Sequence, residues 1–201
     1  MTEAAIKVDD LGQMDLRSLA DRLLETTRVE YVDEGVLLIK NPPGFAHRRI
    51  VENIVDGIMR AYYTSATSTR WTAYAGDFQW DLPDDSGRFY VPDVAVVHPD
   101  AQTRDEERAA IALVIEVTSP ASPDTVLNDR ATKPRQYAKA GIPLYLLVDQ
   151  ERVEWTLYAL AEGWQRYQVA ADGKYGEPVP LPAPFGFEIV TAEWPRTDAE
   201  S

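Results

Sequence analysis

The chain has 201 residues, a length that suits one domain with a hydrophobic core and is short for two. With 45% hydrophobic residues and no cysteine, the composition excludes a disordered chain, disulfide bonds and zinc sites built on thiolates. The net charge of −13 excludes a molecule that is basic over its whole surface, so a nucleic-acid-binding face must be local or depend on a cation or a partner.

No apolar run approaches the length of a membrane span, and the start MTEAAIKVDD lacks the basic and apolar regions of a secretion signal. The absence of cysteine also fits a reducing compartment. We therefore expect a cytoplasmic protein with no membrane partner.

Two helices and a hairpin are predicted in the N-terminal part of the chain. Apolar residues at helical spacing mark a first helix at 15–25. The apolar segments 29–32 and 36–39 flank Asp33-Glu34-Gly35, which predicts a hairpin with a tight turn. Isoleucine and valine recur at every fourth residue between 46 and 62, so a long amphipathic helix is expected there.

Strands dominate the middle of the chain. Residues 71–82 alternate in part between apolar and polar, and 90–97 form a second strand-like segment. The continuous apolar run 112–117 is typical of a strand buried on both faces. A helix is expected at 125–140, ended by Gly141.

The last third of the chain is predicted to be mostly extended. Residues 144–148 read as another buried strand, followed by antiparallel strands at 153–160 and 164–169. Proline occupies every second position of 177–184, which we interpret as a rigid connector, with a proline-motif ligand as the alternative, before a short edge strand at 185–190. No repeat or linker divides the chain, so we predict a single α/β domain over 1–201.

Two carboxylates stand alone in apolar strands. Asp93 is the only charge between residues 90 and 97, and Glu116 is the only charge between 113 and 120. Burying such a carboxylate is costly unless it is paired or bound to a cation. If the two lie side by side, a hard cation such as Mg²⁺ or Mn²⁺ would relieve their repulsion, because these ions prefer carboxylate oxygens.

A lysine and a histidine could complete such a site. Asp129, Lys133 and Tyr137 are spaced four residues apart and share one helix face, from which a lysine would stabilise charge on phosphorus or orient the attacking water. Alone, Lys133 is better explained as a solvated lysine that bridges Asp129, and Asp129 is either a site residue or only that partner. His47 lies on the inward stripe of the long helix, either as a hydrogen-bonded core histidine or as a residue that contacts phosphate or positions water.

These residues belong to a longer ordered set that resembles the Uma2 family of restriction endonucleases, within the PD-(D/E)XK nuclease superfamily. The set comprises, in chain order, Gly35, His47, Pro92-Asp93-Val94-Ala95-Val96-Val97, Glu116-Val117-Thr118-Ser119-Pro120, Asp129, Lys133, Tyr137-Ala138, Ala140-Gly141-Ile142-Pro143, Tyr145 and Val148-Asp149. The order of the whole set makes the match specific, whereas Pro-Asp alone carries no information.

The resemblance implies a restriction-endonuclease-like core, a mixed β-sheet flanked by helices, at about residues 15–170, with 177–201 as an extended C-terminal segment. It also implies a divalent metal and hydrolysis of DNA. By match of motif, Asp93 and Glu116 would be metal ligands, with the backbone carbonyl of Val117 as a third.

The chain departs from the superfamily pattern at one position. The superfamily lysine stands two residues after the glutamate, where this chain has Thr118. In Uma2-like proteins the next helix supplies the lysine, and Lys133 matches that position, although Pro134 directly after it is expected to kink the helix. The superfamily often carries an accessory acid on its first core helix. Glu52 is the candidate, but its place off the apolar stripe favours a solvated surface residue.

The leading hypothesis is therefore a Mg²⁺-dependent endonuclease that cuts DNA, and we expect a homodimer because two active sites cut two strands most easily. The alternative is a catalytically silent member of the fold that serves as a binding or assembly module, which the charge of −13 favours. A glycoside hydrolase with Asp93 and Glu116 as acid and nucleophile explains neither Lys133 nor the metal-friendly setting.

Overall fold

The computed structural model describes residues 4–7, 18–20, 23, 28–33, 36–40, 42–64, 69–76, 78–82, 87–101, 103, 106, 110–118 and 128–196. Most of the first expected helix and the hairpin turn at 34–35 lie outside these ranges, although 18–20 and 23 are helical. No helix in these ranges combines the length and apolar character needed to cross a bilayer.

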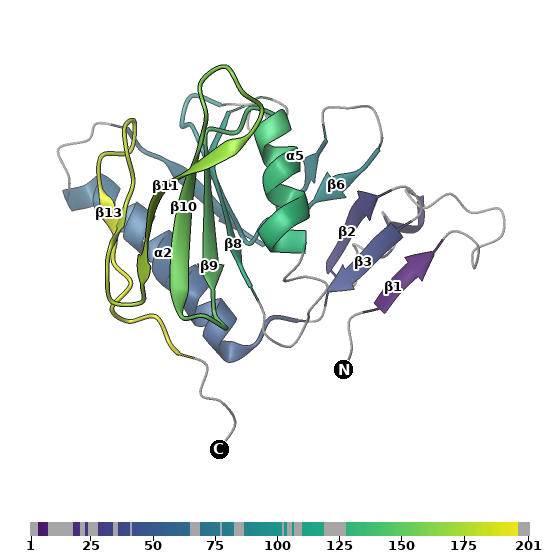
Figure 1. Ribbon diagram of the computed structural model, residues 1–201, viewed down its shortest axis with the longest axis horizontal. Helices are drawn as coiled ribbons and strands as arrows, with labels where there is room; N and C mark the ends of the chain where they lie inside the picture. Colours follow the sequence, from purple (N-terminus) through teal and green to yellow (C-terminus); the bar gives the residue numbers. More distant parts are fainter. Residues whose placement is uncertain are drawn as a thin grey trace.

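A six-stranded mixed sheet forms the centre of the molecule (Figure 1). Its order is β11-β10-β9-β8-β7-β4, and only the central pair β8 and β9 is parallel. The strands are β4 (Thr72–Ala75), β7 (Val94–Val97), β8 (Ile111–Val117), β9 (Leu144–Asp149), β10 (Glu154–Leu160) and β11 (Tyr167–Lys174). The central strands are the apolar runs of the sequence, because a strand covered on both faces has no solvent side.

Among the described residues, one helix covers each face of this sheet. Helix α2 (Phe45–Thr64) packs its isoleucines, such as Ile54, against Val94 and Ile115. Helix α5 (Lys133–Lys139) packs on the opposite face, where its Tyr137 joins the cluster that holds Val114. Successive strand residues point to opposite faces, so even-numbered residues of β8, including Glu116, share the α5 side with Val114. The predicted mixed sheet flanked by helices is confirmed.

A second, smaller sheet lies beside α5 (Figure 1). It is antiparallel throughout, in the order β1-β3-β2-β6-β5. Its strands are β1 (Ala4–Lys7), β2 (Arg28–Asp33), β3 (Val36–Lys40), β5 (Trp80–Asp81) and β6 (Phe89–Tyr90). Strands β2 and β3 confirm the predicted hairpin.

The expectation of one continuous strand over 90–97 is wrong. The segment divides into β6 in the small sheet and β7 in the central sheet, with Val91–Asp93 between them. Pro92 has no N–H to donate to a ladder, so the chain leaves one sheet there and enters the other. The segment 71–82 divides in the same way, into β4 of the central sheet and β5 of the small sheet. The two segments that pass between the sheets are joined by a hydrogen bond of 3.0 Å from the N–H of Gly76 to the carbonyl of Asp93.

The expected helix at 125–140 is also modified. Of its first residues, 125–127 lie outside the described ranges, and Asn128–Thr132 form a π-helical turn before α5 begins at Lys133. Pro134 cannot donate a hydrogen bond to the preceding turn, so the regular α-helical ladder starts only around it. The helix stops just before Gly141, as predicted, and this residue has a φ of 80° that suits glycine.

The C-terminal segment is part of the core rather than a connector. Strand β12 (Val179–Pro180) pairs with β13 (Glu188–Ile189), and the segment packs against α2 (Figure 1). Its buried members in the α2 cluster are Val179, Leu181, Phe185, Ile189 and Trp194. Trp164, expected to begin a strand, is instead exposed in the turn before β11.

Candidate active site

Asp93 contacts the backbone next to Glu116 at one end of the central sheet. Strand β7 begins at Val94, so the last residue of the neighbouring β8, Val117, has no strand partner on that side. Its N–H donates instead to Asp93 Oδ2 at 2.7 Å. Both carboxylates are buried, with Asp93 3% and Glu116 0% exposed. The break at Pro92 therefore places the Asp93 side chain beside the backbone of the residue that follows Glu116.

Asp93 is an anion held by two further side chains. Arg28 Nη1 lies 2.9 Å from Oδ1, and His47 Nε2 lies 3.1 Å from Oδ2. Burial by itself would raise the pKa of Asp93, but the nearby His47 and Arg28 outweigh it and hold that pKa well below its usual range. These contacts, rather than a neighbouring carboxylate, dominate the electrostatics of Asp93.

Glu116 has one satisfied and one unsatisfied oxygen. Its Oε1 accepts hydrogen bonds from Lys133 Nζ at 2.8 Å and from the Tyr137 hydroxyl at 2.9 Å, whereas Oε2 is buried without a hydrogen-bond donor. Burial raises the pKa of Glu116 to about 8, against the opposing effect of Lys133 and with smaller contributions from Asp129 and Asp93. Burial therefore favours the protonated form of Glu116.

Lys133 is fully enclosed by carboxylates. Its Nζ lies 2.8 Å from Glu116, 2.9 Å from Glu30 and 3.0 Å from Asp129, and the side chain is 0% exposed. Burial would lower the pKa of Lys133, but Asp129, Glu116 and Glu30 outweigh it and raise that pKa well above its usual value. The ammonium therefore forms ion pairs with three carboxylates at once and donates a hydrogen bond to Glu116.

The model of the Uma2 family, described as "Putative restriction endonuclease", matches residues 15–192. The chain belongs to this family. A crystal structure titled as a putative nuclease belonging to DUF820 from Anabaena variabilis shares the fold, with a TM-score of 0.61 and 18% identity over 87% of this chain and 95% of that one. No curated protein matches the chain. The family predicted from the motifs is thereby confirmed, and it supports a nuclease function.

Of the accessory candidates in this Uma2 protein, the site contains two. His47 and Asp129 are buried in it through their contacts with Asp93 and Lys133. Glu52 is not part of it, because its side chain is 62% exposed and pairs with Arg49 at 3.4 Å. It lies on the solvent side of α2, where the apolar stripe predicts it.

Thr118, at the superfamily lysine position, has a structural role in this Uma2 protein. It is buried, and its hydroxyl accepts the backbone N–H of Gln150 at 3.1 Å. The side-chain amide of Gln150 donates to the carbonyl of Thr118. These contacts join the ends of β8 and β9.

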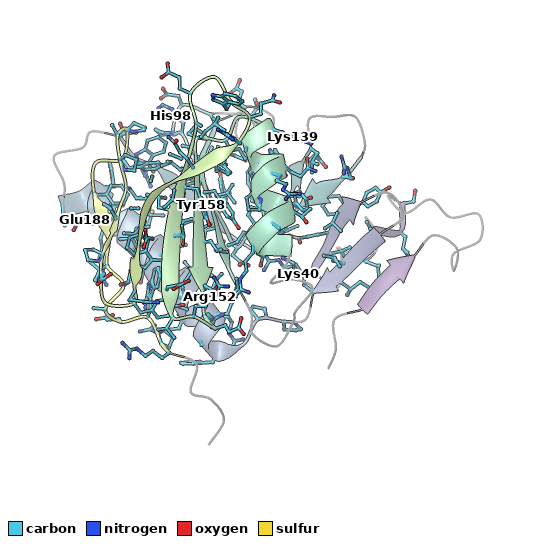
Figure 2. The ribbon with its side chains drawn as sticks, viewed as in Figure 1. Lys40, His98, Lys139, Arg152, Tyr158 and Glu188 are labelled. Carbon is cyan, nitrogen blue, oxygen red and sulfur yellow. The ribbon has the colours of Figure 1, made fainter. Side chains whose placement is uncertain are left out.

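The hairpin β2–β3 contributes three charged residues that the sequence reasoning missed. Glu30 Oε1 accepts the N–H of Val91 at 3.0 Å, and Lys40 Nζ lies 3.1 Å from Glu30 Oε2. Arg28 donates to the carbonyl of Val91 at 2.6 Å in addition to its contact with Asp93. In Figure 2, Lys40 lies by the end of α5 opposite Lys139, which locates the cluster at the N-terminal end of that helix.

A signal for these residues is present in the hairpin pairing. Arg28 faces Lys40 and Glu30 faces Leu38 across the two strands, so the three charges share one face with a core leucine. Opposite charges on a face that also carries buried apolar residues indicate an internal ion pair rather than a solvated surface.

The oxygen atoms of the site fit a hard divalent cation. The described residues contain no group of three His, Asp or Glu side chains arranged to hold a metal, but Mg²⁺ is commonly bound through one or two carboxylates and water. Glu116 Oε2 is a buried oxygen without a donor, and the carbonyl of Val117 faces the same side as its N–H, as in other extended residues. A cation would compete with Arg28 and His47 for Asp93.

Proposed function

We propose that the protein is an endonuclease that hydrolyses phosphodiester bonds of DNA with Mg²⁺ or Mn²⁺. One observation carries the proposal. Beyond the last paired residues of β7 and β8, Asp93 accepts a hydrogen bond from the backbone N–H of Val117. Glu116, the residue before Val117, has one buried carboxylate oxygen that accepts no hydrogen bond. A restriction-endonuclease family and an acidic, oxygen-lined site at the end of its sheet are together best explained by metal-assisted hydrolysis.

In this proposal Asp93 and Glu116 hold the cation, together with the carbonyl of Val117. When bound, the ion supplies Lewis-acid stabilisation of the phosphate and lowers the pKa of an attacking water. Lys133 and Tyr137 hold Oε1 of Glu116, which leaves Oε2 for the metal. Any proton on Glu116 would have to leave when the ion binds.

The role of Lys133 differs from the one its position in the sequence suggests. It is paired with three carboxylates, donates a hydrogen bond to Glu116 and is 0% exposed, so it orients Glu116 rather than contacting solvent. The donors beside Asp93 that reach the surface are Arg28, at 19% side-chain exposure, and His47, at 10%. These two are better placed than Lys133 to meet a phosphate oxygen.

Exposed basic residues continue from the site along the first turns of α2. Arg48 and Arg49 follow His47 and are exposed, and they provide a local positive surface on an acidic protein. Because the total charge is −13, DNA binding should be weak without a divalent cation and should fall steeply with salt. Cleavage of both strands is best served by a homodimer.

A catalytically silent binding module is the second candidate, and a specific observation favours it. Both oxygens of Asp93 have partners inside the protein, and Lys133 Nζ lies within 3.0 Å of three carboxylates. A cluster whose charges are paired internally can serve purely as a structural core.

A plasmid-nicking assay with Mg²⁺, Mn²⁺ or EDTA separates the two candidates. The wild type should cut with either metal and not in EDTA, and Asp93→Asn and Glu116→Gln should abolish cutting. Glu52→Gln is the matched control, since it removes an exposed carboxylate from α2 and should cut at the wild-type rate. A wild type that binds DNA but does not cut with either ion would support the silent module.

A further inference from the structure

Glu30 contacts both halves of the candidate site from outside the central sheet. Its Oε1 accepts the N–H of Val91, two residues before Asp93, and lies 2.9 Å from Lys133, which holds Glu116. Its other oxygen lies 3.1 Å from Lys40. One fully buried carboxylate thus links the segment that leads to one proposed metal ligand with the lysine that orients the other.

We propose that Glu30 is a positioning residue of the active site. From the hairpin, it takes the role that was expected for an acidic residue on the first core helix. The proposal rests on the nuclease function above. The helix candidate, Glu52, is exposed and points away, whereas Glu30 is 0% exposed and inside the charge cluster. The acid comes from a strand of the small sheet, so that sheet is a functional part of the site.

The charge of Glu30 determines where Lys133 lies. With Glu30 neutral, the ammonium is attracted only to Glu116 and Asp129 and moves toward them. Lys40 is left as a buried cation without its carboxylate, at a cost to folding. The position of Glu116 Oε2 changes with Lys133, and the affinity for a divalent cation should fall with it.

Glu30 acts at a distance from substrate. Because its side chain is 0% exposed, it does not touch DNA, and its removal should leave the KM for DNA within about twofold. The loss should appear in kcat and in Mn²⁺ affinity, on the scale of roughly 10–100-fold that outer residues of metal sites show.

A pair of variants distinguishes positioning from simple structural support. Glu30→Gln removes one charge but keeps an oxygen for the N–H of Val91, and it should lower Tm, kcat and Mn²⁺ affinity together. Adding Lys40→Met removes the cation left behind, so the double variant should recover Tm. If Glu30 positions Lys133, kcat and Mn²⁺ affinity stay low in the double variant.

The measurements are Mn²⁺ binding by calorimetry, thermal melting and steady-state plasmid cleavage, with Glu52→Gln as the control that changes none of them. A double variant with wild-type kcat and Mn²⁺ affinity would overturn the proposal and leave a purely structural ion pair. If Glu30→Gln does not fold, the double variant alone decides. A wild type that neither binds Mn²⁺ nor cuts would overturn the nuclease function itself, and with it this role for Glu30.

Discussion

Replacing Glu116 by glutamine should change how stability depends on pH. In the metal-free protein the pKa of Glu116 is raised from 4.5 to about 8, because burial disfavours the charged form. Between these values the folded state keeps a proton that the unfolded chain releases, so stability falls as pH rises through this window. A difference of about 3.5 pH units, at about 1.4 kcal/mol each, gives a loss of about 5 kcal/mol by pH 8.

Glutamine is uncharged at every pH and resembles the protonated acid. Glu116→Gln should therefore match the wild type near pH 5 and exceed it by up to about 5 kcal/mol at pH 8. Asp129, whose pKa is also raised, adds a slope of the same sign to both proteins, so the difference between them isolates Glu116. Urea unfolding in EDTA at pH 5, 6, 7 and 8 measures it. Parallel profiles for the two proteins would refute the reasoning.

Three further outcomes are expected. Asp93→Asn should lower the free energy of unfolding in EDTA by roughly 3–5 kcal/mol, because it leaves Arg28 without its buried carboxylate partner. If the variant instead melts at a higher temperature than the wild type, repulsion between Asp93 and Glu116 is the larger effect. Lys133→Ala should reduce cleavage by roughly 10²-fold or more and should also lower Tm, whereas Lys139→Ala, an exposed residue of the same helix, should do neither in the same assays. Mn²⁺ affinity should rise by up to about tenfold per pH unit between pH 6 and 8, because Glu116 must release its proton when the ion binds. Calorimetry in two buffers of different ionisation enthalpy measures this proton release, and equal binding enthalpies in the two buffers would contradict the prediction.

The sequence predicts those elements of the fold whose buried surface is a continuous run or stripe of apolar side chains. The apolar runs at β8 and β9 and the isoleucine stripe of α2 leave no alternative to a sheet covered by helices. Asp93 and Glu116 are identifiable for the same reason, because a lone charge in such a run must have a partner inside the protein.

The rest of the site depends on contacts between distant segments. Glu30 and Lys40 lie in a hairpin whose alternation resembles a half-exposed ribbon, and Glu30 is paired inside the protein with Lys133 of α5 and with the N–H of Val91. The break at Pro92 is also hard to predict, since a proline is compatible with an edge strand as well as with a change of sheet. Pairing between sheets is a tertiary property, and a single sequence carries little direct signal for it.

The C-terminal segment has a practical consequence for expression of this protein. A chain stopped after β11 would lose Val179, Leu181, Phe185, Ile189 and Trp194, and the remaining members of the same core cluster would border an open apolar patch. Patches of that kind promote self-association in soluble proteins. A shortened form designed to end with the last strand of the central sheet, although it keeps the described residues of the site, should therefore aggregate rather than yield a smaller nuclease.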